Sequence, residues 1–238
     1  MSAVQGDTHL QSDVLEDLAG AVNYRRWLCS LGVRYFGSPD GEGVLEIGSG
    51  LGYYAADWAD LGVRITASEA DPERLAALRT RFADDPRVGV RELTVPIDIQ
   101  ASYDAVVAYN VLEHIPDHVG ALRAFRGLVR TGGAVVLVVP AFPFAMSDFD
   151  RAIGHQRRYT VRSLRATLGA AGLRVQRLHY VNAPGLVAWT VMMRLLRQRP
   201  GDGALLSVYD KAVVPVMSSV EKVIRAPFGQ SVFAVARR

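Results

Sequence analysis

The segment between residues 148 and 160 carries side chains that can take part in chemistry. It contains Asp148, Asp150, His155, Arg157, Arg158 and Tyr159. A histidine titrates near neutral pH and can act as a general base, and arginine can bind a carboxylate or phosphate through two parallel hydrogen bonds. We therefore interpret this segment as a candidate substrate loop, with His155 as a base and Arg158 and Tyr159 contacting the substrate. Alternatively, Arg158 and Tyr159 hold the loop against the rest of the fold.

A second candidate site is the glycine-rich turn in "VLEIGSGLGYYAADWA", residues 44–59. Gly48, Gly50 and Gly52 stand at alternate positions between an apolar run and a helix-like stretch. Glycine permits a positive φ and lets the backbone approach a ligand closely. Glu69 lies 19 positions beyond Gly50, where a carboxylate can accept hydrogen bonds from both hydroxyls of a ribose. The pattern predicts a nucleoside-containing ligand.

These residues must be positioned by the alternating apolar and amphipathic stretches of the chain. We expect strands at 43–47, 63–68, 87–93, 103–110, 133–140, 174–181 and 231–238. We expect helices at 53–61, 71–82, 116–130 and 160–173, with Asp71 and Thr160 as N-caps and Gly172 as a stop. This alternation predicts an α/β fold in which helices cover both faces of a largely parallel sheet. Ligands of such sheets bind beyond the carboxyl ends of the strands.

Two cofactors compete for the glycine turn, a dinucleotide and S-adenosylmethionine. The dinucleotide fingerprint spaces its glycines as G-x-G-x-x-G. Here the spacing is G-x-G-x-G, with Tyr53 and Tyr54 following and Glu46 two residues before the first glycine. This spacing departs from the dinucleotide fingerprint, and at this point both cofactors stay open.

Together, "LEIGSGLG", Glu69 and "YNVLEHIPD" resemble the class I S-adenosylmethionine-dependent methyltransferases of the type 11/12, small-molecule branch. The resemblance covers about residues 43 to 140. It implies a Rossmann-like seven-stranded sheet in the order 3-2-1-4-5-7-6, with strand 7 antiparallel. The strand count predicted above agrees, except that an unusually long insert separates the last two strands.

The resemblance also implies which residues contact the cofactor. They are Glu46, Gly48, Gly50, Gly52, Glu69, Ala70, Glu92, Asn110 and Val111. The glycine turn would lie against the methionine part and Glu69 would bind the ribose. Glu92 would contact the adenine amino group, although the family usually has aspartate at that place. Asn110 and Val111 would line the methyl-bearing end.

Methyl transfer from a sulfonium is an in-line displacement from an activated donor. Proximity and alignment alone contribute up to about 7–11 kcal/mol in favourable systems. A general base is needed only where the acceptor must lose a proton, as a hydroxyl or ammonium group must. We predict His155 and His114 as candidate bases. For His114, in "LEHIPD", the alternative is a structural or cofactor-shaping role.

We expect one methyltransferase domain over residues 1–238. It comprises an N-terminal helical cap (1–40), a cofactor-binding core (41–181), a helical insert (182–229) and a last strand (230–238). The insert shows helical periodicity, with breaks expected at Pro200-Gly201, Pro215 and Pro227. We interpret it as a lid over the acceptor, with Trp189 and, from the cap, Tyr24 as further substrate contacts. A dimer interface or a peripheral membrane contact are the alternatives.

The composition restricts partners and compartment. The net charge is +3 and no run of Lys or Arg exceeds two residues, so we expect no nucleic-acid partner. The single Cys29 excludes an internal disulfide and a cysteine-built metal site, and we expect no bound metal. No signal peptide is visible and no apolar run reaches the ~18 residues of a membrane span. We therefore expect a cytoplasmic monomer or homodimer without stable membrane insertion.

These observations predict methyl transfer from S-adenosylmethionine to an O or N atom of a small-molecule acceptor. We expect the acceptor in natural-product or glycan/lipid biosynthesis. The alternatives are a non-methyl alkylation or cyclisation with the same cofactor, or a regulator that binds the cofactor without catalysis. A nucleic-acid methyltransferase is disfavoured. Enzymes resembling those that methylate amino groups of DNA or RNA carry "DPPY" or "NPPY" after the fourth strand, where this chain has "YNVL".

Overall fold

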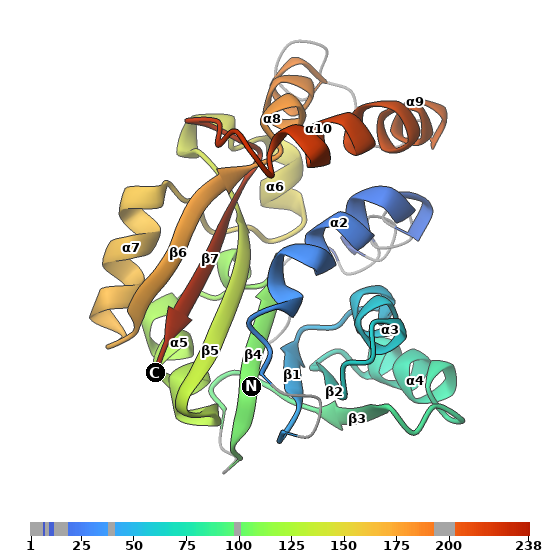
Figure 1. Cartoon of the computed structure of the whole chain (residues 1–238), viewed down its shortest axis with the longest axis vertical. Helices are drawn as coiled ribbons and strands as arrows, with labels where there is room; N and C mark the ends of the chain where they lie inside the picture. The colour runs from blue at the N-terminus through green and yellow to red at the C-terminus, as the bar shows by residue number, and fades with distance from the viewer. Residues whose placement is uncertain (1–6, 8–9, 12–18, 38–40, 98–100, 193–202) are drawn as a thin grey trace.

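The computed structural model describes residues 7, 10–11, 19–37, 41–97, 101–192 and 203–238 (Figure 1). These residues form one seven-stranded sheet with helices on both faces. Its strands are β1 (Val44–Ile47), β2 (Ile65–Glu69), β3 (Val88–Glu92), β4 (Tyr103–Tyr109), β5 (Val129–Pro140), β6 (Arg174–Val181) and β7 (Ser231–Arg237).

The strand order confirms the predicted Rossmann-like topology. It is β3-β2-β1-β4-β5-β7-β6, and β7 runs antiparallel to β5 and β6 while the other neighbouring pairs are parallel. The carboxyl ends of β1 to β6 therefore share one edge with the beginning of β7. This edge carries the glycine turn and the segment 148–160.

Helices cover the two faces in separate groups. The α2 (Val22–Val33), α3 (Tyr53–Asp60) and α4 (Pro72–Arg81) helices pack on one face, and α5 (His118–Leu128) and α7 (Val161–Ala170) pack on the other. Successive strand side chains point to opposite faces, so Val44 joins the first core and Leu45 the second. Fully buried Trp58 and Phe125 are the largest apolar side chains that α3 and α5 contribute.

The predicted caps at Asp71 and Thr160 and the stop at Gly172 are confirmed, whereas the helix expected over 116–130 ends at Leu128 because β5 begins at Val129. The side chain of Asp71 accepts hydrogen bonds from the backbone N–H groups of Glu73 and Arg74, at 3.1 and 3.0 Å. Thr160 forms a reciprocal capping box at the start of α7. Gly172, beyond the end of α7, adopts φ +74°, a conformation that glycine reaches without steric cost.

The insert after β6 is helical, as predicted. It contains α8 (Ala183–Thr190), α9 (Gly203–Val208), a π-helix (Tyr209–Val213) and α10 (Val214–Val220). Pro215 does not break the helix as expected: the π-helix runs directly into α10, and the helical path continues through the proline. The break predicted at Pro200-Gly201 lies outside the described residues.

The insert is bonded to the N-terminal helix. Buried Asp210 of the π-helix accepts hydrogen bonds from the backbone N–H groups of Asn23 and Tyr24, at 3.1 and 2.8 Å. Figure 1 shows α8 and α10 beyond the end of the sheet where β6 finishes and β7 begins. In the part of the chain described, no helix combines the length and apolar character needed to span a membrane.

Candidate active site

The glycine turn follows β1 directly, and Gly48, Gly50 and Gly52 all have positive φ. A Cβ on Gly48 would lie 2.9 Å from Cγ2 of Val111, in the turn after β4. A Cβ on Gly52 would lie 2.6 Å from the Phe82 ring. At Gly48 and Gly52, therefore, glycine also serves the packing of the turn against neighbouring protein side chains.

Glu69 at the end of β2 is bound to this turn. Its Oε2 accepts a hydrogen bond from the Gly50 N–H at 2.9 Å. Its Oε1 accepts from the N–H groups of Ala70 and Asp71, at 2.8 and 3.1 Å. Carboxylate oxygens offer about four acceptor sites between them, so Glu69 keeps capacity for a further donor such as a ribose hydroxyl.

Glu46 lies in β1 below the same turn and is only 2% exposed. Its Oε2 has no hydrogen-bond partner among the described residues. Burial raises the pKa of this carboxyl group to about 8, against a hydrogen bond with Ser49, and the charge of Glu69 raises it further. A buried carboxyl group with an unused oxygen is suited to a positively charged ligand group, which would favour its ionised form.

The remaining predicted cofactor residues occupy neighbouring strand ends. Asn110 follows β4 with φ +54°, its N–H bonded to the Val138 carbonyl at 2.8 Å and its side chain exposed. Val111 contacts the glycine turn, as described above. Glu92 ends β3 in register with Glu69 and is exposed. The structure thus brings all nine predicted cofactor residues to one sheet edge.

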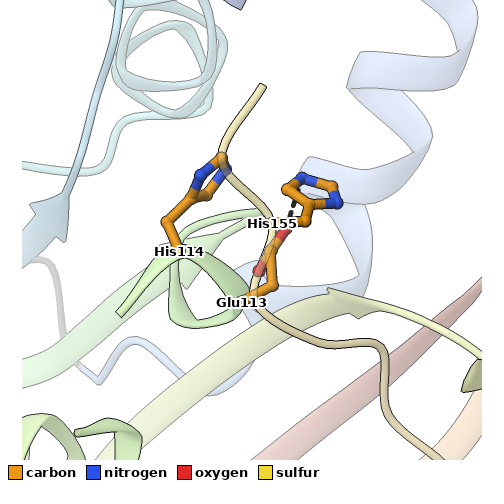
Figure 2. A group of neighbouring side chains, drawn as sticks. All are labelled: Glu113, His114 and His155. Carbon is orange, nitrogen blue, oxygen red and sulfur yellow. Dashed lines mark ion pairs between the residues drawn. The ribbon is translucent and has the colours of Figure 1, made fainter. Parts of the chain in front are cut away.

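The two predicted bases also come together. His114 ends a short 3₁₀ helix (Leu112–His114) after β4, and His155 lies on the loop before α7. Their ring centroids are 4.6 Å apart, and Nε2 of His155 lies 3.8 Å from Oε1 of Glu113 (Figure 2). Glu113 was not singled out from the sequence, and its position next to His114 was the only available signal.

Burial sets the protonation of this cluster. It raises the pKa of Glu113 to about 7, although the charges of His155 and Arg158 oppose the shift. It lowers the pKa of His114 to about 3, and the neighbouring charge of His155 acts in the same direction. At neutral pH the His114 imidazole is therefore neutral.

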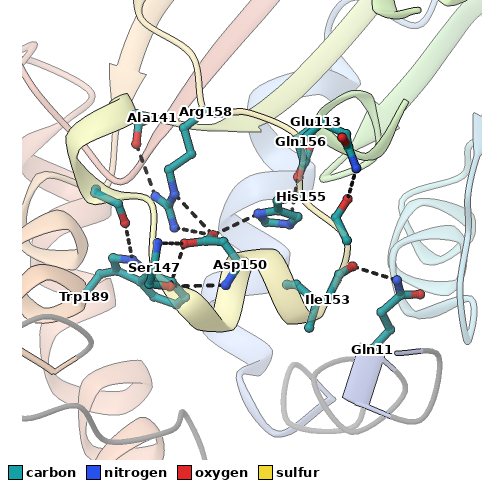
Figure 3. Close-up of polar contacts among 12 residues, drawn as sticks. Gln11, Glu113, Ala141, Ser147, Asp150, Ile153, His155, Gln156, Arg158 and Trp189 are labelled. Carbon is teal, nitrogen blue, oxygen red and sulfur yellow. Dashed lines mark hydrogen bonds and ion pairs between the residues drawn. The ribbon is translucent and has the colours of Figure 1, made fainter. Parts of the chain in front are cut away.

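Asp150 holds the other side of His155 (Figure 3). It lies in α6 (Asp148–Ala152), and its Oδ1 bonds Nδ1 of His155 at 2.9 Å and accepts from Nη2 of Arg158 at 2.7 Å. Its Oδ2 accepts from the backbone N–H and the hydroxyl of Ser147, both at 2.7 Å. Burial alone would raise the pKa of Asp150, but the bond to His155 and the charge of Arg158 outweigh it and lower the pKa below its usual range. An ionised Asp150 requires the proton on Nδ1 of His155 and leaves Nε2 free to accept.

Arg158 and Tyr159 are both buried and bind protein groups. Arg158 donates to the Ala141 carbonyl at 3.2 Å, and its guanidinium lies 4.9 Å from the centre of the Trp189 ring. The Tyr159 hydroxyl is 2.8 Å from Nδ1 of His118. This is the geometry of the alternative in which they hold the loop, while substrate contact by either residue stays a prediction.

The other two predicted substrate residues flank the edge. Trp189 of α8 is half-buried, and its Nε1 donates to the Ala145 carbonyl at 3.2 Å. Burial raises the pKa of Tyr24 to about 12, against hydrogen bonds with Asn182 and Ser231. The structure therefore brings Trp189 to the loop that carries His155, residues 153–160, which we call the histidine loop. It brings Tyr24 to the beginning of β7.

Comparison with known proteins identifies the core. Residues 45–135 match the family model of a methyltransferase domain. The ubiquinone biosynthesis O-methyltransferase of Xanthomonas axonopodis pv. citri is 35% identical over 105 residues, which are 42% of this chain and 43% of that protein. The protein of the same name from Methylocella silvestris is 31% identical over 137 residues, 53% of each chain. The chain thus spans about half the length of the curated relatives it matches.

Solved structures share the fold at low identity. The protein solved with the Trm112 methyltransferase activator of Haloferax volcanii, itself described as a methyltransferase, has a TM-score of 0.65 at 14% identity, covering 99% of both chains. Phosphoethanolamine N-methyltransferase 2 of Haemonchus contortus, in complex with S-adenosyl-L-methionine, has a TM-score of 0.62 at 17% identity, covering 89% of this chain and 52% of that one. The family-model match and the two relatives thus identify a methyltransferase domain in this core, and the sheet order is the one expected above for class I S-adenosylmethionine-dependent methyltransferases.

Proposed function

We propose that this chain transfers the methyl group of S-adenosylmethionine to an oxygen atom of a small-molecule acceptor. The methyltransferase-domain match and the O-methyltransferase relatives support the cofactor and the reaction class. The observation that carries the proposal is the meeting, at one sheet edge, of the glycine turn, two buried carboxyl groups and the Asp150–His155 pair.

In this proposal the cofactor is held by residues already fixed in place. Glu69 binds the ribose hydroxyls while its backbone bonds keep it against the turn. Glu46 faces a positive group of the cofactor, which gives its unpartnered oxygen a charge partner. Glu92 contacts the adenine, and Asn110 and Val111 border the methyl group.

An acceptor hydroxyl must lose a proton as it is methylated, and a positioned histidine can take that proton. An ammonium acceptor has the same need, so the histidine alone does not choose between oxygen and nitrogen. His155 takes the proton on Nε2, and Asp150 stabilises the imidazolium that forms. Neutral His114 borders the same space and does not repel that charge. The name of the curated relatives, O-methyltransferase, supports the choice of oxygen.

The cap and insert then cover the acceptor. The chain works as one domain in this proposal, with the insert as a lid over the core and Asp210 joining it to α2. Trp189, Tyr24 and the Arg158–Tyr159 segment border the acceptor space. The biosynthetic context, in natural-product or glycan/lipid metabolism, and the cytoplasmic location stay predictions.

The test is product analysis with purified protein, S-adenosylmethionine and a panel of small phenols, alcohols and amines. We expect S-adenosylhomocysteine to form only with a hydroxyl-bearing acceptor, in equal amount with the methylated product. Methylthioadenosine as the product would show another alkylation instead. Cofactor binding without turnover of any acceptor would contradict an enzymatic role.

A further inference from the structure

Glu113, His114 and His155 form a cluster that can do more than move a proton. One ligand-type atom from each lies within 4.8 Å of the others. Two of the side chains come from the turn after β4 and the third from the facing loop (Figure 2). The backbone fixes this meeting, because the N–H of Gln156 donates to the Glu113 carbonyl at 2.9 Å.

The Glu113 carboxyl group is fully buried, and neither of its oxygens has a hydrogen-bond partner among the described residues. The nearest cationic candidate is Nε2 of His155 at 3.8 Å, beyond hydrogen-bond distance. Burying a carboxylate without a partner is costly, so side chains of this kind are normally paired or coordinate a metal. The position of Glu113 therefore calls for a positive charge between it and the histidines.

The surroundings of His155 resemble the outer shell of a metal site. A metal-binding histidine usually donates its second ring N–H to a carboxylate, which fixes the ring and frees the other nitrogen. Here Nδ1 of His155 bonds Asp150, and Asp150 is itself held by Arg158 and Ser147. Nε2 of His155 then faces Glu113.

We propose that Glu113, His114 and His155 bind one divalent transition-metal cation, for which Zn²⁺ is the best-matched ion. Two imidazoles and one carboxylate are a ligand set typical of catalytic zinc sites, which keep a further position open for water or substrate. Tetrahedral zinc–ligand bonds of about 2.0–2.2 Å place two ligand atoms about 3.3–3.6 Å apart, so binding must draw the three side chains closer. The sequence predicted no metal because only cysteine-built sites were considered.

The cation also gives the proposed reaction a second route, and this part rests on the proposed function. A hydroxyl bound at the open position has a lowered pKa and loses its proton to water. Its oxygen then forms a bond to the methyl carbon while the electrons of the carbon–sulfur bond return to sulfur, leaving a thioether. In the cation-bound protein His155 is a ligand, and its role as a base applies to the cation-free protein.

The site is tested by metal binding without any acceptor, so its outcome is independent of turnover. The purified full chain is stripped with EDTA, dialysed, and titrated with Zn²⁺ by calorimetry, with Mg²⁺ as a comparison. We expect one Zn²⁺ per chain and at least tenfold weaker binding of Mg²⁺. The variants Glu113→Gln, His114→Ala and His155→Ala should each weaken Zn²⁺ binding at least tenfold. His179→Ala, which removes a histidine from β6, is the matched control and should bind as the original chain does.

Asp150→Asn tests the outer shell, and we expect Zn²⁺ affinity about 10–100-fold lower. Circular dichroism of each variant checks that it is folded, and Glu113→Gln keeps the shape of the side chain. Zn²⁺ binding that is absent, or equally strong in the cluster variants and in His179→Ala, would overturn the metal site. If binding were equally strong in the cluster variants, Zn²⁺ would bind elsewhere. A proton shared between Glu113 and His155 would then explain why these side chains lie together. Zn²⁺ binding without methyl transfer would leave the site standing and refute only the proposed reaction.

Discussion

At the scale of single residues, the buried carboxyl groups of the site differ in what surrounds them. Asp150 is saturated with donors, and Glu69 is held by three backbone N–H groups. Glu46 and Glu113 are as deeply buried but keep oxygens without partners. For Asp150 the bonded His155 and Arg158 outweigh burial and lower the pKa. Burial instead raises the pKa of Glu46 and Glu113, so a positive ligand group would favour their ionised forms.

Glu46 makes the stability of the cofactor-free protein depend on pH. Its pKa of about 8 in the folded protein exceeds the ~4.3 expected for an unfolded chain, so the folded state binds more protons between these values. Its stabilising effect is complete below about pH 4 and is lost as pH rises through about 8. We expect Glu46→Gln to flatten the decrease in the free energy of unfolding, measured by urea denaturation from pH 5 to 9. Exposed Glu73→Gln is the control, and an unchanged slope in Glu46→Gln would refute this assignment.

His155→Ala should separate chemistry from cofactor binding. A positioned general base contributes typically 10²–10⁴-fold, so we expect turnover to fall by about that factor. The affinity for S-adenosylmethionine, measured by calorimetry, should change less than threefold, because the cofactor is held by the glycine turn and Glu69. His179→Ala, which removes a histidine of β6, is the comparison. Equal turnover in His155→Ala and the original chain would remove the base from the mechanism.

At the scale of elements, the histidine loop is fastened from several sides. Arg157 donates to the carbonyls of Ile115 and Pro116, Arg158 binds Asp150, and the backbone of Tyr159 pairs with Pro140. These bonds tie the loop to the turns after β4 and β5. The loop therefore carries a fixed site rather than an adaptable one.

Arg158→Ala distinguishes loop fastening from substrate binding. Removing one partner of a buried ion pair typically costs about 3–5 kcal/mol of stability, because Asp150 keeps an uncompensated charge. We expect a loss of that size in thermal or urea unfolding, and less than about 1 kcal/mol for the more exposed Arg157→Ala. A variant that keeps its stability but shows a raised KM for the acceptor would instead support the predicted substrate contact.

Local signals allowed several elements to be predicted, and others depended on distant contacts. Asp71 and Thr160 marked helix starts because capping is decided within three residues. The beginning of β5 was misplaced, because Val129 pairs with Tyr103 before a register shift that the sequence does not show. The role of Glu113 was missed for the same kind of reason, since its neighbour His155 arrives from a loop some 40 residues later. Likewise, only the structure shows that Arg158 binds Asp150.

At the scale of the whole molecule, two peripheral segments are joined at the edge where the site lies. Asp210 accepts the first N–H groups of α2, in the manner of a helix cap supplied by the insert. Asn182, at the end of β6, accepts from the Tyr209 hydroxyl at 2.5 Å. The helical cap and the insert are therefore expected to act together as one cover.

Asp210→Ala should loosen that cover without unfolding the core. Loss of a cap typically costs about 0.5–2 kcal/mol. We expect faster cleavage in the insert under limited proteolysis and a raised KM for the acceptor, with the affinity for S-adenosylmethionine changed less than threefold. Ser219→Ala, on the exposed side of α10, should behave as the original chain does. If Asp210→Ala also lost affinity for S-adenosylmethionine, the insert would belong to the cofactor site instead.

Binding of an adenosyl sulfonium cofactor by the glycine turn and Glu69 underlies every step of the proposed reaction. Calorimetric titration of the purified chain with S-adenosylmethionine, S-adenosylhomocysteine and NAD⁺ tests it most directly. We expect binding of the first two and no heat with NAD⁺. We also expect about 10–100-fold weaker binding in Glu69→Gln, because hydrogen bonds to a charged acceptor contribute about 1.5–3 kcal/mol. Heat with NAD⁺ but none with either adenosyl compound would contradict it.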